Sequence, residues 1–139
     1  MEILLKPVDQ KNWQFIYNLR TNESSKNNFY SQKQFSLSDH YSYLSKQEKN
    51  PNFFHWIIVS DSKNVGYVRI LDNDISIMIE SHYENKGIGS HALKLVEDEA
   101  KKLGLKKLVG RVLTHNTSSK KIFEKNNYKL KMYWLEKDI

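Results

Sequence analysis

With 139 residues and no cysteine, the chain is long enough for one packed domain, and its composition excludes a disulfide framework, a thiolate zinc site and a cysteine nucleophile. The net charge of +6 indicates anionic partners, but the lysines come as scattered pairs and singles, which argues against a nucleic-acid surface. The N-terminus lacks the apolar core of a signal peptide and no apolar run is long enough to cross a bilayer, so we expect a cytoplasmic protein without a membrane partner.

The first half of the chain predicts an edge strand, two helices and three strands. The edge strand lies at the N-terminus, and a helix is expected over residues 9–20 with Asp9 as its N-cap. A second helix begins near Ser38 and Asp39. Three strands rich in aromatic and β-branched residues follow and are expected to form an antiparallel meander; they are predicted at 53–59, 65–71 and 75–80.

The second half of the chain alternates helices and strands. Gly87-Ile88-Gly89 opens a helix whose apolar residues recur at helical spacing until Gly104 ends it. A strand over 108–113 is followed by a short helix that Asn116 or Thr114 caps. A last strand over 128–135 completes the order βααβββαβαβ. The sequence therefore predicts a mixed α/β fold in a single domain, residues 1–139.

The glycine loop before the long helix is the most informative segment. Gly87 and Gly89 leave the backbone bare at a strand-to-helix junction, so amides and the helix N-terminus can hold a pyrophosphate. A β-carbon at either glycine is expected to obstruct that anion. No Walker loop is present, because no Gly-Lys-Ser/Thr end follows. The dinucleotide fingerprint is formally matched, but residues 112–115 hold no carboxylate where that fold requires one.

Two motifs resemble those of the GNAT superfamily of N-acetyltransferases. Residues 77–90, Ile-Met-Ile-Glu-Ser-His-Tyr-Glu-Asn-Lys-Gly-Ile-Gly-Ser, resemble its acetyl-CoA-binding motif, and Asn116-x-x-Ser119-x-x-x-Phe123 with the following Glu-Lys-Asn-Asn-Tyr resembles its downstream motif. The resemblance extends to the order of elements along nearly the whole chain, and it implies acetyl-CoA as cosubstrate. It also implies that strand backbone near residue 77 holds the pantetheine and polarises the thioester carbonyl. The implied cofactor-binding residues are Ile77, Ile79, Glu84, Asn85, Lys86, Gly87, Ile88, Gly89, Ser90, Asn116, Ser119 and Phe123.

The chain departs from the family pattern at three positions. Glu84 stands where the family usually has Gln or Arg, and a carboxylate there does not favour a pyrophosphate. Asn127 replaces a glycine, but asparagine tolerates the left-handed conformation. Phe123 stands where many members have a tyrosine that protonates the leaving thiolate. Because a thiol with a pKa of ~8.5 can leave as thiolate, losing the phenol is expected to lower activity by on the order of 10²-fold without abolishing it.

Three side chains flank the strand where thioester and amine are expected to meet. Asp74, Glu80 and His82 are therefore candidates for the catalytic base, Glu80 directly or through water, and each has the alternative of a solvated turn or strand-end residue. The five histidines show no metal-binding spacing, so no metal is expected.

The acceptor is expected to bind between the first two helices and their loop. Tyr17-Asn-Leu-Arg20-Thr21 and His40 resemble a GNAT subgroup that acetylates amino-sugar nucleotides, of the pseudaminic-acid biosynthesis type. The resemblance implies a small-molecule amine acceptor that Arg20 and His40 bind. Phe29 and Tyr30 are the aromatic candidates for substrate binding, because they can stack on a sugar or nucleobase; their alternative is packing within the loop. Arg20 can bind a diphosphate or cap its own helix. A protein N-terminal acetyltransferase of the ribosomal-protein type and a catalytically silent acyl-CoA-binding module remain alternatives, and a homodimer is a further expectation.

Overall fold

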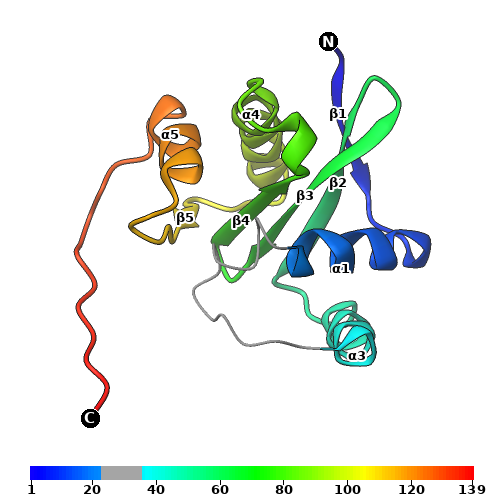
Figure 1. The fold of residues 1–139 in the computed structure, drawn as a ribbon, viewed down its shortest axis with the longest axis horizontal. Helices are drawn as coiled ribbons and strands as arrows, with labels where there is room; N and C mark the ends of the chain where they lie inside the picture. Colours follow the sequence, from blue (N-terminus) through cyan, green and yellow to red (C-terminus); the bar gives the residue numbers. More distant parts are fainter. Residues whose placement is uncertain (23–35) are drawn as a thin grey trace.

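The computed structural model describes residues 1–22 and 36–139, and it places five strands in one mixed sheet with helices on both faces (Figure 1). Phe29 and Tyr30 lie outside the described residues. The elements are β1 (Ile3–Pro7), η1 (Gln10–Asn12), α1 (Trp13–Thr21), α3 (Leu37–Gln47), β2 (Phe53–Ser60), β3 (Lys63–Leu71), β4 (Asp74–Ile79), η2 (Ser81–Tyr83), α4 (Ile88–Lys102), β5 (Val109–Gly110) and α5 (Thr117–Lys125).

The strands lie in the order β1-β2-β3-β4-β5. The first four are antiparallel neighbours, as the short polar turns between them predict, and β5 is parallel to β4. The mixed α/β class and the meander are therefore confirmed. The parallel pairing covers only Asp74 with Val109 and Ile75 with Gly110, so β4 and β5 separate beyond these residues.

Local signals in the sequence set the helix ends. Asp9 caps η1 in a capping box with Asn12, immediately before α1. Ser36, whose side chain accepts a bond from the Asp39 amide, starts α3 slightly earlier than predicted. Gly104 has a φ of +83° just after α4, in the position predicted to end that helix.

The two faces of the sheet carry separate hydrophobic clusters. α4 and α5 cover one face, where Leu93 and Val96 belong to a cluster with Ile75 and Val68. α1 and α3 cover the other face, where Ile16 and Leu44 belong to a cluster with Ile57, Tyr67 and Met78. Figure 1 shows these helix pairs on opposite sides of the strands. No helix in the described ranges is both long and apolar enough to cross a membrane.

The predicted last strand is wrong. Residues 128–139 form no strand, and the predicted strand over 108–113 shrinks to β5. A strand needs a neighbour for its amides and carbonyls, and within this chain the two-residue β5 offers little edge to pair with. Leu130, Met132 and Tyr133 consequently stay 74%, 71% and 82% exposed on an extended segment that runs away from the sheet (Figure 1).

Candidate active site

The main cleft of the domain lies where β4 and β5 separate. Its volume is about 350 Å³, and its walls come from β4, the glycine loop, the residues after β5 and α5. Beyond Ile75, β4 has no strand partner on the β5 side among the described residues. The cleft therefore exposes a strand edge whose backbone groups can bond an extended ligand such as a pantetheine arm.

The N-terminus of α4 opens at the same cleft and fits an anion. Gly87 is its N-cap, with a φ of +83° and no side-chain cap. The amides of the first helical turn therefore remain available, and the helix dipole favours negative charge there. A β-carbon built on Gly87 would meet no described atom within 4 Å, so the loop presents an open cradle. These features fit the pyrophosphate of acetyl-CoA.

The cleft brings together nearly all of the residues that the sequence assigned to the cofactor. Ile88 and Lys86 are the exceptions: Ile88 is 1% exposed in the core, and Lys86 lies over the Tyr83 ring. The cleft is lined by the predicted residues Ile77, Ile79, Glu84, Asn85, Gly87, Gly89, Ser90, Asn116, Ser119 and Phe123.

The structure explains the glycine at position 89 differently from the sequence, which predicted that a β-carbon there would obstruct the bound anion. A β-carbon there would lie 2.6 Å from Cδ1 of Ile122 and 3.6 Å from Cγ1 of Ile79. The glycine thus permits α4 to approach α5 and β4 closely. Asn126 reinforces this contact, because its Nδ2 donates to Ser90 Oγ at 3.0 Å. A side chain at position 89 would meet protein atoms before it reached a ligand.

Phe123 is a core residue as well as a cleft residue. It is 7% exposed, and its ring packs edge-on against Tyr128 with centroids 4.9 Å apart. A β-carbon on Gly110 would lie 2.7 Å from this ring, so glycine in β5 makes room for it. Asn116, at the start of α5, accepts a bond from the Ser119 amide and keeps its Nδ2 group as a donor.

The three candidate bases lie outside the residues that line the cleft. Asp74 forms ion pairs with Arg69 and Arg111, each at 3.2 Å, at the start of β4. His82 is exposed on η2. Glu80 is half-buried directly after β4, and its amide donates to the Val65 carbonyl at 2.8 Å. By strand alternation Glu80 shares the face of Met78, on the side of α1.

Sequence reasoning missed the basic residues of the cleft. Arg111, Lys121 and Lys125 line it, together with Ser118. Positions 118, 121 and 125 recur at helical spacing and so share one face of α5. That spacing was readable in the sequence, but the lysines were interpreted as scattered charges. Together they give an anionic ligand a positive surface.

A second cavity, of about 310 Å³, lies on the opposite side of the sheet beside α1 and α3. It is lined by Arg20, Asp39, His40 and Tyr43. His40 is 1% exposed, and its Nε2 donates to the Trp13 carbonyl at 3.1 Å, which joins α3 to α1. Burial, followed by the neighbouring Arg20 charge, lowers the pKa of His40 to about 4. His40 is therefore a neutral packing residue as well as part of the cavity wall.

Other polar groups are buried on this face of the sheet. His55 Nδ1 and Tyr67 Oη are hydrogen-bonded at 2.9 Å, and burial lowers the pKa of His55 to about 4. Burial also lowers the pKa of Arg20, whose guanidinium lies 6.0 Å from the Tyr43 ring and interacts with the charge of Arg69. The face thus combines aromatic walls with two arginines.

Comparison with known proteins identifies the class of this domain. Residues 2–129 match the Acetyltransferase (GNAT) domain family, and the chain belongs to that family. The cosubstrate typical of the family is acetyl-CoA.

One curated relative and two solved structures illustrate the similarity. An uncharacterized protein of Methanocaldococcus jannaschii is 31% identical; the match covers 92% of this chain and 28% of the relative, so the chain spans 28% of that protein's length. The crystal structure of a domain from the same organism has a TM-score of 0.81 at 29% identity, covering 92% of this chain and 88% of that one. Spermidine N-acetyltransferase from Vibrio cholerae, solved with CoA and spermine, has a TM-score of 0.80 at 17% identity. The match covers 88% of this chain and 78% of that one.

Proposed function

We propose that this domain transfers the acetyl group of acetyl-CoA to a primary amine. The observation that carries the proposal is the separation of β4 from β5 beside the uncapped N-terminus of α4. A strand edge and a helix N-terminus at one cleft suit a ligand that has both an amide-containing arm and a pyrophosphate.

Different groups of the cleft bind different parts of acetyl-CoA. Acetyl-CoA supplies the acetyl group as a thioester. Backbone amides from Asn85 to Ser90 hold the pyrophosphate, and the open edge of β4 around Ile77 and Ile79 binds the arm and donates to the thioester carbonyl. Asn116 contributes its Nδ2 group. Phe123 has no proton to give, so the sulfur leaves as thiolate.

We assign the catalytic base to Glu80, acting directly or through water. Its half-buried position at the end of β4, on the α1 side, supports this choice. Asp74 is held by two arginines, which favours a structural role. His82 is exposed on η2, which favours the solvated alternative.

The proposed acceptor is an amino-sugar nucleotide that binds on the α1–α3 side. Arg20 in the second cavity is suited to a diphosphate, and Tyr43 offers an aromatic surface. The positive charge of Arg20 opposes a polyamine, the ligand class of the Vibrio cholerae neighbour. A peptide N-terminus remains the second candidate. Phe29 and Tyr30 are kept as proposed sugar or base contacts. The proposed enzyme is cytoplasmic and homodimeric.

An acceptor screen tests this proposal. The purified chain is incubated with acetyl-CoA and a panel of an amino-sugar nucleotide, short peptides and spermidine, while thiol release is followed. Acceptor-dependent release with the sugar nucleotide is expected. Release with peptides alone would reject the acceptor assignment. If CoA binds but no panel member increases release, the silent binding module is favoured.

Arg20→Ala sharpens the acceptor assignment. A diphosphate contact stabilises the bound acceptor in ground and transition states alike, so the acceptor KM should rise about tenfold or more while kcat changes little. The KM for acetyl-CoA should stay constant, because the cofactor cleft lies on the other side of β4. Lys46→Ala, which removes an exposed basic side chain from α3, is the matched control. Equal KM values for both variants would exclude Arg20 from the acceptor site.

A further inference from the structure

The turn between β3 and β4 attaches the segment around β5 to the sheet and fixes the position of Arg111. Asn73 Nδ2 donates to the Lys107 carbonyl at 2.6 Å, and the Val109 amide donates to the Asn73 carbonyl at 2.8 Å. Just after β5, Arg111 Nε donates to Asp74 Oδ1 at 3.2 Å. These contacts hold the segment at the point where β4 and β5 begin to separate.

Arg111 lines the cofactor cleft and also reaches the α1–α3 face of the sheet. Its partner Asp74 accepts a second bond from Arg69 Nη1 at 3.2 Å. Asp74 precedes Ile75, and Arg69 follows Val68. Because both apolar neighbours belong to the α4-side cluster, the side chains of Asp74 and Arg69 point to the α1 side. Arg111 therefore connects the cofactor cleft with the face on which the acceptor is proposed to bind.

The two arginines on Asp74 differ in how many of their donors are used. Arg69 Nη1 bonds both the carbonyl and the carboxylate of Asp74, and its side chain is 22% exposed. The Arg111 side chain is 55% exposed and uses only Nε, so within residues 1–22 and 36–139 both of its Nη groups lack a partner. Two such donors on one planar group fit a carboxylate or a phosphate. Because one carboxylate serves two guanidinium groups, these three side chains keep a positive charge.

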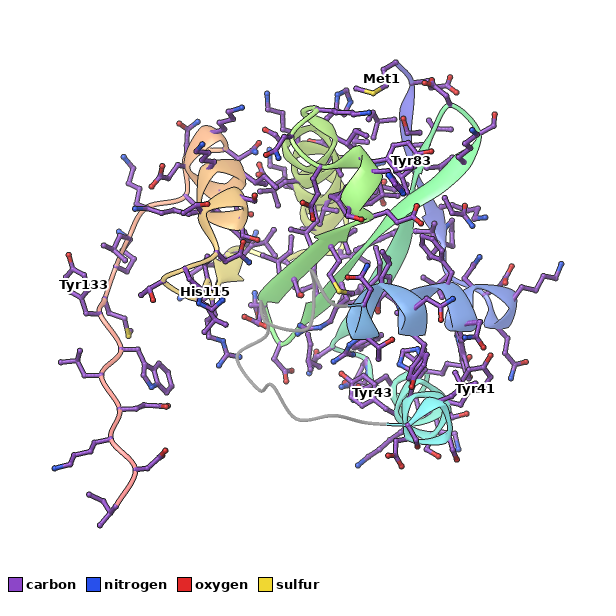
Figure 2. All side chains as sticks on the ribbon, in the orientation of Figure 1. Met1, Tyr41, Tyr43, Tyr83, His115 and Tyr133 are labelled. Carbon is purple, nitrogen blue, oxygen red and sulfur yellow. The ribbon has the colours of Figure 1, made fainter. Side chains whose placement is uncertain are left out.

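The phosphates of acetyl-CoA bind at the other end of the cleft in the proposed arrangement. The six residues of β4 place Asp74 about 20 Å from the glycine loop, further than an arginine side chain extends. Figure 2 shows Tyr83 near the end of β4 that leads into the glycine loop, and His115 near β5 at the opposite end. An anion bound by Arg111 is therefore not the pyrophosphate of the cofactor.

We propose that Arg111 is a specificity residue whose two Nη groups bind a phosphate or carboxylate of the acceptor, and that Asp74 is the positioning residue that orients it. The inference rests on the proposed acetyl-CoA cleft, and it narrows the acceptor to amines that carry an anionic group near the nitrogen. Arg20 lies on the same face and interacts with the charge of Arg69, so a second guanidinium is available to a larger anion such as a diphosphate. An amino-sugar nucleotide meets this requirement, and a polyamine does not.

The first test compares UDP-glucosamine with glucosamine, which lacks the phosphates, by calorimetric titration of the CoA-loaded protein. The parent should bind UDP-glucosamine at least tenfold more tightly than glucosamine, and Arg111→Gln should lose about tenfold of that affinity. Arg111→Lys should recover only part of it, because it keeps the charge without the fork. Lys107→Ala, which removes an exposed basic side chain from the same segment, is the matched control. Equal affinity of the parent and Arg111→Gln for UDP-glucosamine overturns the proposal.

The affinity for CoA decides which ligand Arg111 serves. Lys125 lies at the phosphate end of the cleft, because its neighbour Asn126 donates to Ser90 Oγ. Lys125→Ala should therefore weaken CoA binding severalfold, whereas Arg111→Gln should leave it within about twofold of the parent. A loss of CoA affinity in Arg111→Gln with unchanged UDP-glucosamine binding would assign Arg111 to the cofactor and overturn the proposal.

A double-mutant cycle tests the role of Asp74. Asp74→Asn should weaken UDP-glucosamine binding in the parent and change it little in the Arg111→Gln background, because the side chain that Asp74 orients is then absent. The same loss in both backgrounds would show that Asp74 acts on the fold alone and would overturn its positioning role. Acetyl transfer is measured beside binding in every variant. Arg111-dependent binding of UDP-glucosamine without any transfer would reject the proposed function and leave this inference standing.

Discussion

The two faces of the sheet differ in how far apart in the sequence their parts lie. The α4–α5 face and its cleft use β4, the glycine loop and α5, which follow one another along residues 74–125. The α1–α3 face joins segments from both ends of the first half of the chain and buries polar groups between them, among them His40, His55 and Tyr67. The first arrangement places the residues of one cleft close together in the sequence, whereas the second depends on contacts between distant segments.

The two faces also differ in how their polar groups are satisfied. On the α4 side, backbone amides are left uncapped, and glycines allow close approach. On the α1 side, polar side chains are buried and hydrogen-bonded inside the protein. Residues near the second cavity therefore contribute to the stability of the fold, and variants there need a stability measurement beside the kinetic one.

His40→Ala has the largest expected effect. It removes a buried side chain and leaves the Trp13 carbonyl without its donor, so the free energy of unfolding should fall by about 2–4 kcal/mol. Urea unfolding monitored by circular dichroism measures this change. His91→Ala, at an exposed position of α4, should alter the midpoint little. If His40→Ala keeps its stability and changes only the acceptor KM, the α1–α3 face is a binding surface alone.

Gly89→Val is the corresponding test of the α4 side. Because the new side chain meets Ile122, we expect a loss of about 1–3 kcal/mol in the free energy of unfolding. Adding Ile122→Ala should restore part of this loss by opening space. Calorimetric titration of the folded double variant with acetyl-CoA then separates the two roles. Tenfold weaker binding of acetyl-CoA by that variant would show that position 89 contributes to the anion-binding loop. Unchanged affinity would show that Gly89 serves only the packing of α4.

The acid sensitivity of folding should come from the α1–α3 face. In the folded chain the pKa values of His40 and His55 are lowered to about 4, whereas the unfolded chain binds these protons near pH 6.5. Below pH 6.5 the unfolded state binds more protons, so stability is complete above that pH and is lost towards pH 4. For buried His40 the loss is about 3 kcal/mol.

Unfolding by urea at several pH values between 7 and 4 measures this dependence. His55→Gln, which can still bond Tyr67, should reduce the slope, and His91→Ala should keep it. A slope unchanged in His55→Gln would assign the acid sensitivity to other groups.

Phe123→Tyr has the smallest expected effect. The added hydroxyl supplies a proton donor in the cofactor cleft while the ring keeps its contact with Tyr128, so kcat should stay equal or rise. The free energy of unfolding should change by less than about 1 kcal/mol. Steady-state kinetics with the best acceptor of the screen checks this. A large fall in kcat with normal acetyl-CoA binding would show that position 123 must be apolar.

The cleft on the α4–α5 side was largely predictable because its signals are local. A glycine pair at a strand-to-helix junction specifies a bare helix N-terminus, and Asn116 specifies the start of α5. The meander followed from alternation and turn residues in the same way. The shared position of Lys121 and Lys125 on one face of α5 could also have been predicted, because helical spacing applies to polar residues as it does to apolar ones.

By itself, the sequence determined the class of fold, the order of elements through α5 and the glycine loop at the N-terminus of α4, because propensity, caps and spacing act within a few residues. Tertiary structure decided what depends on distant neighbours. It placed His40 against Trp13, bound Asp74 between Arg69 and Arg111, and put Ile122 where a β-carbon of Gly89 would lie. It also left residues 129–135 without a strand neighbour, because alternation makes a segment able to pair but only an available edge makes it a strand.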